Sequence, residues 1–548
     1  MENRKYIFVI GGVMSGVGKG TSASSIGTIL KARGYKVTAL KIDPYVNVDA
    51  GTMNPTEHGE VFVLNDGDET DQDMGNYERF MDITLSRDNY MTTGRVYETV
   101  IHRERNLEYQ GKCVQVVPHI PLEVIDRIKK ASSKDRSDIT IIEVGGTVGE
   151  YENILFLEAI RMMKIKNPNS VLTVMVSYVP CPNKVGEMKT KPTQHAVRTV
   201  NGAGIQPDII IARSEVPMDT KRKEKISLFC SVPEECVISA PDCNTVYEIP
   251  LNFERDNLST IILNKFGLEG KNSDLSDWTE LVGKIKGARE KLKIGIIGKY
   301  FGTGDFVLSD AYISVIEAVK HACFYHGVKP DIDWINSEVY ERDPHKLESL
   351  KEYDGIVVPG GFGSRGIEGI LAAIEFCRTN QIPYFGLCYG MQLLVIEYAR
   401  NVLGLTDAHT TEVDRDTKNP VIDIMPEQKK NLEDGNYGAT MRLGAYDALL
   451  AKGTIAHAAY GKDKISERHR HRWEVNPLYI EQLEKAGLVF SGKSPEGQLM
   501  EIAELPKSAH PFFLASQFHP EFKSSPIKSH PLFLRFVEAA KERHGKNK

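Results

Sequence analysis

The chain has 548 residues, with 68 Lys and Arg against 74 Asp and Glu, and a formal charge of −6 at pH 7. This length suits about two to four domains, and 41% hydrophobic with 26% charged residues excludes a largely disordered chain. The acidic balance excludes a general attraction to nucleic acid or anionic membranes, so any phosphate-binding site must be local.

The pattern of cysteines and the length of the apolar runs indicate the cellular compartment. The eight cysteines are scattered and form no Cys-x-x-Cys pair, which argues against a zinc knuckle and fits a reducing cytosol. The apolar run 6–13 follows Arg4 and Lys5 as in a signal peptide, but it continues into glycines without a cleavage site. No apolar run approaches the ~18 residues of a membrane span. We therefore expect a soluble cytoplasmic protein with neither nucleic-acid nor membrane partners.

The first half of the chain alternates short Val- and Ile-rich runs with helical patterns. The helix after the first run is predicted from about Thr21 to Arg33, where Gly34 ends it. Strands buried on both faces and separated by helices indicate a parallel α/β sheet. The predicted strands are residues 6–10, 37–42, 139–144, 171–176, 209–211 and 237–239.

A polar stretch divides the chain into two predicted α/β domains, 1–267 and 293–548, joined by a linker at 268–292 with a short helix around 278–286. Both are expected to be doubly wound, mostly parallel sheets. The stretch 408–438 is polar and is predicted to be an insert or flexible loop. The predicted elements of the second domain are strands 294–297, 355–358 and 383–387 and helices 310–325, 367–379 and 391–399.

The segment GGVMSGVGKGT (11–21) lies between the first strand and the first helix. Backbone N–H groups of such a loop, together with a helix N-terminus, bind anions, and Lys19 adds a mobile positive charge. The segment is a variant of the P-loop, because position 13 is Val and Gly20 moves the hydroxyl to Thr21. A glycine-rich turn without a ligand is the alternative, and we favour phosphate binding.

Two further segments could serve a nucleotide site. Glu143 ends a predicted strand, and the acidic loop 66–73 offers oxygen ligands suited to Mg²⁺, although an acidic run is more often a solvated loop. In KTKPTQ (189–194), two lysines two apart in an extended chain would point the same way and could hold a triphosphate. Without other information, a basic surface loop is the stronger interpretation of that segment.

A thiol site is predicted in the second domain. Cys388 lies in GLCYG (386–390), the Gly-x-nucleophile-x-Gly turn between a strand and a helix. Downstream, the strand-like run 513–518 leads to His519 and Glu521, which would alternate onto one face, so that Glu521 orients His519 and His519 deprotonates Cys388. The loop PGGFG (359–363) could give backbone N–H groups to an oxyanion.

With both sites in view, the chain resembles the CTP synthase family from end to end. The C-terminal third alone would indicate only a class I glutamine amidotransferase, which many biosynthetic enzymes share. The segments that carry the resemblance are GGVMSGVGKGT, KIDPYVNVDAGTMNPTEHGEVFVLNDGDETDQDMGNYERF, EVGGTVGEYE, KTKPTQHAVR, PGGFGSRG, GLCYGMQ, ERHRHRWEVNP and QFHPEF.

The resemblance implies a P-loop-type synthetase fused to a class I glutamine amidotransferase. ATP would phosphorylate the 4-oxygen of UTP, and ammonia released from glutamine at Cys388, His519 and Glu521 would pass internally and displace phosphate to give CTP. Mg²⁺ would assist, GTP would activate, CTP would inhibit, and a homotetramer is expected. The activity would belong to pyrimidine nucleotide biosynthesis.

The resemblance also implies the binding residues. The ATP set is Ser15, Gly16, Val17, Gly18, Lys19, Gly20, Thr21, Lys41, Asp73, Pro241, Asp242 and Cys243. The set for UTP and CTP is Ser15, Glu150, Tyr151, Glu152, Lys189, Thr190, Lys191, Pro192, Thr193, Gln194 and Lys225. The glutamine set is Gly361, Tyr389, Gly390, Met391, Gln392, Glu412 and Arg472. Asp73 and Glu143 would hold Mg²⁺, and 439–444 with Phe362 would sense GTP.

Some positions depart from the family pattern. Glu150-Tyr151-Glu152 replaces Asp-Ile-Glu in the CTP pocket, Gln110 replaces an apolar residue, Ala439 replaces a glycine, and 241–243 lacks a lysine. Three rival hypotheses are another glutamine-dependent P-loop ligase such as a cobyrinate amidase, a partitioning-type ATP switch or filament protein with an inactive amidase domain, and a stand-alone glutaminase or γ-glutamyl hydrolase. KTKPTQ and ERHRHRWEVNP argue against the first, and an intact Cys388, His519 and Glu521 set argues against the second.

Overall fold

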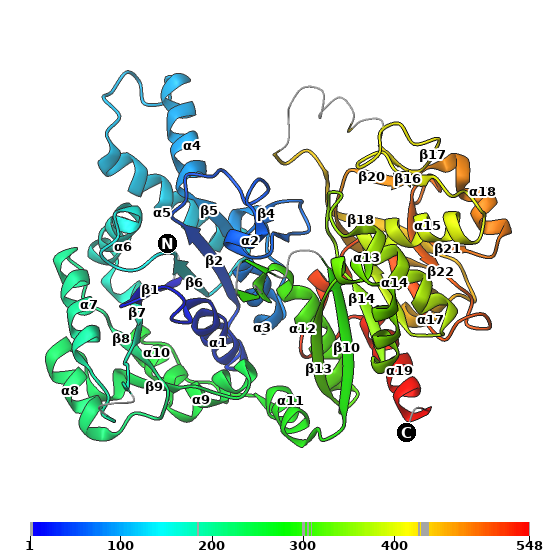
Figure 1. Ribbon diagram of the computed structural model, residues 1–548. Coiled ribbons are helices and arrows are strands. Elements are labelled where there is room, and N and C mark those ends of the chain that lie inside the picture. Colours follow the sequence, from blue (N-terminus) through cyan, green and yellow to red (C-terminus); the bar gives the residue numbers. More distant parts are fainter. Residues whose placement is uncertain are drawn as a thin grey trace. The chain divides into compact units, whose positions relative to one another are not determined.

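The computed structural model describes residues 4–182, 186–298, 302–303, 306–307, 309–425, 428 and 438–546. The chain forms two compact units (Figure 1). Unit 1 comprises Met1–Ala50 and Asp73–Val282, and unit 2 comprises Gly51–Gln72 and Gly283–Lys548. The segment Gly51–Gln72 therefore leaves the first unit and folds with the second, which a linear division of the sequence does not anticipate. Within the described ranges, no helix is long and apolar enough to cross a membrane.

Unit 1 is built on a seven-stranded sheet in the order β5-β2-β6-β1-β7-β8-β9. Every neighbouring pair is parallel, which confirms the predicted parallel α/β sheet. The six predicted strands are all present, and the short β5 was not predicted. The bounds are β1 (Lys5–Gly12), β2 (Val37–Asp43), β5 (Tyr90–Thr92), β6 (Ile139–Val144), β7 (Val171–Tyr178), β8 (Ile209–Ser214) and β9 (Val237–Pro241).

Helices connect these strands, and the first, α1 (Lys19–Ala32), is buried along most of its length. Gly34 has φ +77° and follows the helix end, as predicted. The linker helix is α11 (Ser276–Gly287), whose Trp278 ring lies 5.3 Å from Phe80. The other helices are α3 (Asp73–Met81), α4 (Thr93–Arg105), α5 (Val116–Lys134), α6 (Ile154–Lys166), α7 (Lys191–Gly202), α8 (Thr220–Cys230), α9 (Ile249–Arg255) and α10 (Leu258–Phe266).

Unit 2 contains a nine-stranded sheet in the order β13-β10-β14-β15-β23-β22-β21-β18-β19. Its β13 to β23 half is parallel, and the half from β23 to β19 is antiparallel. The bounds are β10 (Lys291–Gly298), β13 (Lys329–Asn336), β14 (Gly355–Val358), β15 (Tyr384–Leu387), β18 (Arg442–Leu450), β19 (Lys464–His471), β21 (Val489–Lys493), β22 (Met500–Glu504) and β23 (Phe513–Ser516).

Apolar cores cover both faces of this sheet. The helices are α12 (Ile313–Tyr325), α13 (Glu338–Arg342), α14 (Ile367–Thr379), α15 (Tyr389–Asn401), α17 (Ile455–Tyr460), α18 (Pro477–Lys485) and α19 (Pro531–Lys546). The smaller elements are β3 (Phe62–Val63), β4 (Glu69–Thr70), α2 (Pro55–His58), β11 (Gly302–Thr303) and β12 (Phe306–Val307).

The prediction that residues 408–438 form an insert or flexible loop is partly wrong. β16 (Ala408–Thr410) and β17 (Asn419–Ile424) form a small sheet with β20 (Trp473–Val475). The polar composition concealed these strands, because in β17 only the two central residues Val421 and Ile422 are fully buried. Residues 426–427 and 429–437 lie outside the described ranges.

Candidate active sites

Cys388 occupies a sharp turn between β15 and α15. Its backbone has φ +50° and ψ −96°, a conformation that costs energy for any residue with a side chain. The flanking glycines make the turn possible, because a Cβ on Gly390 would lie 2.4 Å from the carbonyl oxygen of Val358, and one on Gly386 would lie 2.8 Å from the Gly390 backbone. The Cys388 N–H donates to the Ser516 carbonyl at 2.7 Å. This geometry is that of the predicted nucleophile turn.

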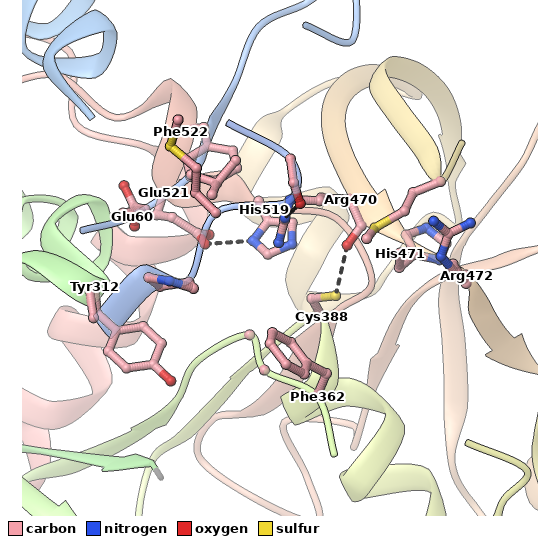
Figure 2. Close-up of a pocket in the computed structure, with 18 of the residues that line it drawn as sticks. Glu60, Tyr312, Phe362, Cys388, Arg470, His471, Arg472, His519, Glu521 and Phe522 are labelled. Carbon is pink, nitrogen blue, oxygen red and sulfur yellow. Dashed lines mark hydrogen bonds and ion pairs between the residues drawn. The ribbon is translucent and has the colours of Figure 1, made fainter. Parts of the chain in front are cut away.

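His519 and Glu521 follow the neighbouring strand and contact each other. Nδ1 of His519 lies 2.7 Å from Oε1 of Glu521, and both side chains are buried (Figure 2). The predicted reason for this contact was wrong. β23 ends at Ser516, and residues 520–523 form a 3₁₀ turn, so the two side chains meet through a turn and not through alternation along a strand. The aromatic ring of Phe522 stacks on the imidazole at 5.0 Å.

The second ring nitrogen of His519 remains available. Nε2 is buried, and it has no hydrogen-bond partner among the described residues. His519 and Cys388 line the same cavity, and a Cβ on Gly360 would come within 2.9 Å of the His519 ring and 3.8 Å of the Cys388 Cβ. The backbone at Gly360 therefore approaches both residues closely only because it carries no side chain.

Burial alone would lower the pKa of His519, but the Glu521 carboxylate and the Cys388 sulfur outweigh it and raise the pKa to about 10. At neutral pH the imidazole of His519 is therefore protonated. A protonated imidazole beside a cysteine favours the thiolate and can donate a proton to a leaving amine. The arrangement can perform nucleophilic acyl transfer from an amide.

The cavity at Cys388 has a volume of about 840 Å³. Four predicted glutamine-binding residues line it: Gly361, Gln392, Glu412 and Arg472. The other three, Tyr389, Gly390 and Met391, do not line it. Tyr389 instead donates its hydroxyl to the carbonyl of Gly363 at 3.0 Å, and Met391 is fully buried in the core.

The predicted oxyanion loop is only partly available. The N–H of Gly363 already donates to the carboxylate of Glu412 at 2.8 Å, so it is committed to holding that side chain. Gly360 and Gly361 remain against the cavity. Glu412 is thereby fixed at the rim, where a carboxylate can bind a cationic amino group.

Sequence reasoning missed one wall of this cavity. Residues 51–55, with Glu60 and Val61, line it together with Arg470. A sequence signal for this wall was present in the segment RHRHR (468–472). Side chains alternate along β19, so Arg468 and Arg470 lie on one face and His469 and His471 on the other. Arg468 donates to Asn65 at 2.7 Å, and Arg470 donates to Glu69 at 2.8 Å.

In unit 1, the predicted phosphate loop follows β1. Val13, Gly16 and Gly18 have φ of +81°, +70° and +89°, and α1 begins at Lys19. Left-handed residues in such a loop can turn neighbouring N–H groups toward a common centre, as anion-binding loops require. Burial lowers the pKa of Lys19, whose Nζ donates to the Gly146 carbonyl at 2.9 Å.

The two predicted metal ligands, Asp73 and Glu143, both contact the ammonium group of Lys41. Nζ of Lys41 lies 2.9 Å from Oε1 of Glu143 and contacts the carboxylate of Asp73 more closely. Burial would lower the pKa of Lys41, but Asp73 and Glu143 raise it well above its ordinary value. Burial raises the pKa of Glu143, whereas Lys41 holds that of Asp73 below its ordinary value against the effect of burial.

This pair of carboxylates fits the needs of Mg²⁺ in a nucleotide site. Such an ion typically takes one or two protein carboxylates, and phosphates and water complete the coordination. The described residues contain no group of three or more Asp, Glu, His or Cys side chains that could hold a metal by themselves. Asp73 and Glu143 would therefore act with phosphate oxygens, and Lys41 would neutralise their charge.

A smaller cavity of about 80 Å³ adjoins the phosphate loop. It is lined by Gly18 and Thr21 from the loop region and by Pro241 and Cys243 from the predicted adenine segment. Arg213, which sequence reasoning missed, also lines it and pairs with Asp242 at 2.9 Å. Asp242 itself is not among the lining residues.

The predicted extended conformation of KTKPTQ is wrong. Helix α7 begins at Lys191 with Pro192 in its first turn, where proline is favoured because it lacks an N–H. Thr193 is buried and accepts from the Ser177 hydroxyl, and Gln194 donates to Thr190. The segment therefore offers a helix N-terminus rather than an extended clamp.

The remaining nucleotide candidates are surface residues. Lys189 pairs with Glu187 at 2.9 Å, and Lys225 of α8 contributes positive charge near the same Glu187 carboxylate. Glu150 accepts from the Thr147 N–H at 2.8 Å, and Tyr151 is 90% exposed. Exposed apolar and charged side chains of this kind suit contact with a ligand or a partner.

The chain is similar to known proteins along almost its whole length. A family model described as the CTP synthase N-terminus matches residues 5–268, and one described as class-I glutamine amidotransferase matches residues 307–539. A CTP synthase of Pyrococcus abyssi is 53% identical over 540 residues, which are 98% of each chain. The chain belongs to the CTP synthase family. A CTP synthase of Carboxydothermus hydrogenoformans is 51% identical over 537 residues, again 98% of each chain.

Among solved structures, the glutaminase domain of Trypanosoma brucei CTPS with bound acivicin is 38% identical, with a TM-score of 0.42; the match covers 46% of this chain and 94% of that one. As a member of the CTP synthase family, the enzyme is a glutamine-hydrolysing ligase that converts UTP to CTP in pyrimidine biosynthesis and uses ATP. This assignment confirms the family hypothesis and excludes the rival ligases and the non-enzymatic ATP switch.

Proposed function

We propose that glutamine hydrolysis occurs at Cys388, His519 and Glu521. The thiolate attacks the side-chain amide carbon of glutamine, and the C–N bond breaks as the His519 imidazolium gives its proton to the departing ammonia. A γ-glutamyl thioester on Cys388 remains. Water, deprotonated by the now neutral His519, adds to this thioester and releases glutamate and the thiolate, which restores the starting protonation.

One observation carries this proposal. Glu521 holds Nδ1 of His519, while Nε2 is left unpartnered among the described residues in the cavity that Cys388 lines. Gly360 and Gly361 would direct backbone N–H groups at the developing oxyanion, and Glu412 with Arg472 would bind the amino and carboxylate groups of glutamine. Gln392 would contact the same substrate.

In unit 1, the loop Ser15–Thr21 and Lys19 would hold the phosphates of ATP. Phosphoryl transfer to the uracil 4-oxygen of UTP converts a poor leaving group into phosphate, which ammonia then displaces. Asp73 and Glu143 would hold Mg²⁺, which supplies charge neutralisation on the phosphates when bound. Lys41 would keep both carboxylates in place, and Pro241 with Cys243 would contact adenine through backbone atoms.

UTP and inhibitory CTP are proposed to share residues 189–194 and Lys225, with Glu150–Glu152 at the product-specific pocket. The α7 N-terminus supports this proposal, because no side-chain hydrogen bond caps it and a helix N-terminus favours a phosphate. GTP activation is proposed through residues 439–444 and Phe362, of which Phe362 and Met441 line the Cys388 cavity.

Two of the sequence departures support altered regulation. Gln110 and Ala439 both have φ of +53°, the left-handed region that favours glycine. The strain at Ala439 is of the order of 1 kcal/mol, and it lies at the start of the segment proposed to respond to GTP. We further propose a homotetramer and, as divisions of the sequence, a synthetase domain at 1–267, from which Gly51–Gln72 folds with unit 2, a linker at 268–292 and an amidotransferase domain at 293–548.

The experiment that tests the two-site function is CTP formation from UTP, ATP and Mg²⁺ with glutamine or ammonium as nitrogen source. Wild-type enzyme should use both sources, with glutamine use raised by GTP. Cys388→Ala should lose glutamine-dependent synthesis and keep ammonium-dependent synthesis. Glutamine-dependent synthesis by Cys388→Ala would remove Cys388 from the mechanism.

A further inference from the structure

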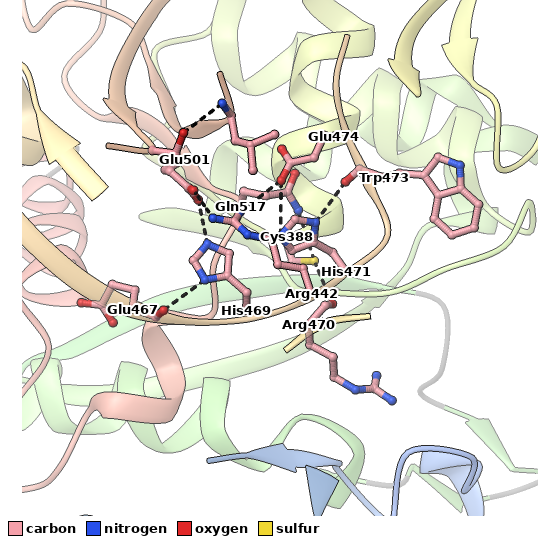
Figure 3. Close-up of polar contacts among 12 residues, drawn as sticks. Cys388, Arg442, Glu467, His469, Arg470, His471, Trp473, Glu474, Glu501 and Gln517 are labelled. Carbon is pink, nitrogen blue, oxygen red and sulfur yellow. Dashed lines mark hydrogen bonds and ion pairs between the residues drawn. The ribbon is translucent and has the colours of Figure 1, made fainter. Parts of the chain in front are cut away.

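Gln517 is a fully buried polar residue directly after β23, between the strand and His519. Its backbone N–H donates to the Glu501 carbonyl at 2.8 Å, which fixes the main chain. Its side-chain Nε2 lies 3.6 Å from Sγ of Cys388, within hydrogen-bond distance for sulfur (Figure 3). Gln517 does not line the cavity and so contacts the nucleophile from the protein side.

The direction of this contact follows from its neighbours. The carbonyl oxygen of Trp473 can only accept, and Nε2 of Gln392 donates to it at 3.0 Å. The same Nε2 lies 3.4 Å from Gln517, so the atom of Gln517 that faces it must be the amide oxygen. The amide nitrogen of Gln517 therefore faces Cys388 and donates to its sulfur.

The sulfur has a second neighbour of opposite character. Sγ of Cys388 lies 3.8 Å from the carbonyl oxygen of Arg470, which can only accept (Figure 2). The thiol can donate its proton to this oxygen, whereas a thiolate would be repelled by it. The amide N–H of Gln517 gains strength as a donor when the sulfur becomes negative, because hydrogen bonds to charged acceptors are about twice as strong as neutral ones.

We propose that Gln517 is a positioning residue for glutamine hydrolysis, which holds the sulfur of Cys388 and stabilises its thiolate while Gln392, at the substrate side, fixes the amide. The inference rests on the proposed role of Cys388 as the nucleophile. It explains why a fully buried glutamine occupies this position, where an apolar residue would fill the space without the cost of burying an amide.

Two variants test the proposal. Gln517→Met keeps the length of the side chain and removes the donor, and Gln517→Glu keeps the shape and places a carboxylate oxygen against the sulfur. Gln482→Glu, the same chemical change on an exposed position of α18, is the matched control. The readout is the rate at which iodoacetamide alkylates Cys388, followed by mass spectrometry of the Cys388 peptide from pH 5 to pH 10.

We expect Gln517→Met to slow alkylation at pH 7 about 10-fold, with its pH midpoint moved upward, and Gln517→Glu to do so more strongly, by about 100-fold. The kcat for glutamine-dependent synthesis should fall in parallel, with a smaller change in KM for glutamine. Ammonium-dependent synthesis and the Gln482→Glu control should match wild type. If Gln517→Glu fails to fold, the alkylation profile of Gln517→Met tests the proposal by itself.

An unchanged alkylation profile in folded Gln517→Met, with or without a loss of kcat, would overturn the proposal, since a purely structural role would not involve the thiolate. The failure of the underlying function is separate. If Cys388 is not the nucleophile, Cys388→Ala will still carry out glutamine-dependent synthesis. If only the role of Gln517 is wrong, Cys388→Ala will be inactive with glutamine and Gln517→Met will behave as wild type.

Discussion

Arg470 is ion-paired with Glu69, whose carboxylate is almost fully buried; Nε of the arginine lies 2.8 Å from Oε1 of the glutamate. The carbonyl oxygen of the same Arg470 faces the sulfur of Cys388. Glu69 belongs to the segment Gly51–Gln72, which ends immediately before Asp73, the candidate metal ligand. One residue of β19 therefore contacts both the thiol and the polypeptide that leads to Asp73.

This pairing predicts the effect of Glu69→Gln. The change keeps the shape of the side chain and removes the charge that holds Arg470, and the loss of a charged hydrogen bond costs about 2 kcal/mol. We expect glutamine-dependent synthesis to fall about 10-fold or more and ammonium-dependent synthesis to change less. The ratio of the two rates is the measurement, with exposed Glu496→Gln as the control. Equal losses with both nitrogen sources would remove Glu69 from the glutamine pathway.

Glu521→Gln should change the pH dependence in a defined direction. The carboxylate helps to raise the pKa of His519 to about 10, so its removal should lower this pKa. The alkaline limit of glutaminase activity, where imidazolium is lost, should then move to lower pH, and kcat at pH 8 should fall about 10- to 100-fold. Initial rates from pH 6 to pH 10.5 check this expectation, and an unchanged alkaline limit would contradict it.

The same variant predicts a change in stability. Because the folded pKa of His519 is above the ordinary value of 6.5, its protonation stabilises the fold fully below pH 6.5, and this contribution is lost as the pH rises through about 10. The melting temperature of Glu521→Gln should therefore lie furthest below that of wild type near pH 6 and approach it above pH 10. A difference that does not vary with pH would assign Glu521 a role in packing only.

The features that could be predicted from the sequence are those that local residue patterns determine. Val- and Ile-rich runs predicted most strands of the unit 1 sheet and the strands β10, β14, β15 and β23 of the unit 2 sheet, but not β5, β13, β18, β19, β21 or β22. The glycines around Cys388 indicated the turn because backbone crowding leaves few alternatives there. The folding of Gly51–Gln72 with unit 2 depends on contacts such as Arg470 with Glu69, which are 401 residues apart, and Gln517 lies 129 residues from Cys388. No local pattern encodes either contact. The helical start at Lys191 was missed because the spacing of Lys189 and Lys191 was interpreted as an extended chain, although Pro192 suits a first helical turn.

Lys19→Ala should stop synthesis from either nitrogen source. Its ammonium group is buried beside the phosphate loop, and phosphoryl transfer needs that charge before ammonia can react. We expect CTP formation to fall at least 100-fold with glutamine and with ammonium, and basal glutaminase activity to persist. Exposed Lys129→Ala serves as the control. Ammonium-dependent CTP formation at the wild-type rate would rule out the phosphate role of Lys19.

Gly20→Ala tests whether the position of Asp73 matters for the reaction. A Cβ at this position would lie 2.4 Å from Oδ1 and 2.9 Å from Cγ of Asp73, and the carboxylate cannot simply rotate away because Lys41 holds it. We expect the methyl group to displace Asp73 and to lower ammonium-dependent synthesis more than 10-fold, with glutaminase activity unchanged.

Gly283→Ala is the matched control for Gly20→Ala. Gly283 also lies in a helix, α11, but among the described atoms nothing approaches within 4 Å of an added Cβ. This substitution should therefore stabilise the protein by about 0.5–1 kcal/mol through helix propensity and leave both activities unchanged. If Gly20→Ala instead behaves as Gly283→Ala does, the carboxylate of Asp73 can move without consequence, and its proposed role in holding Mg²⁺ fails, because metal coordination tolerates displacements of only a few tenths of an ångström.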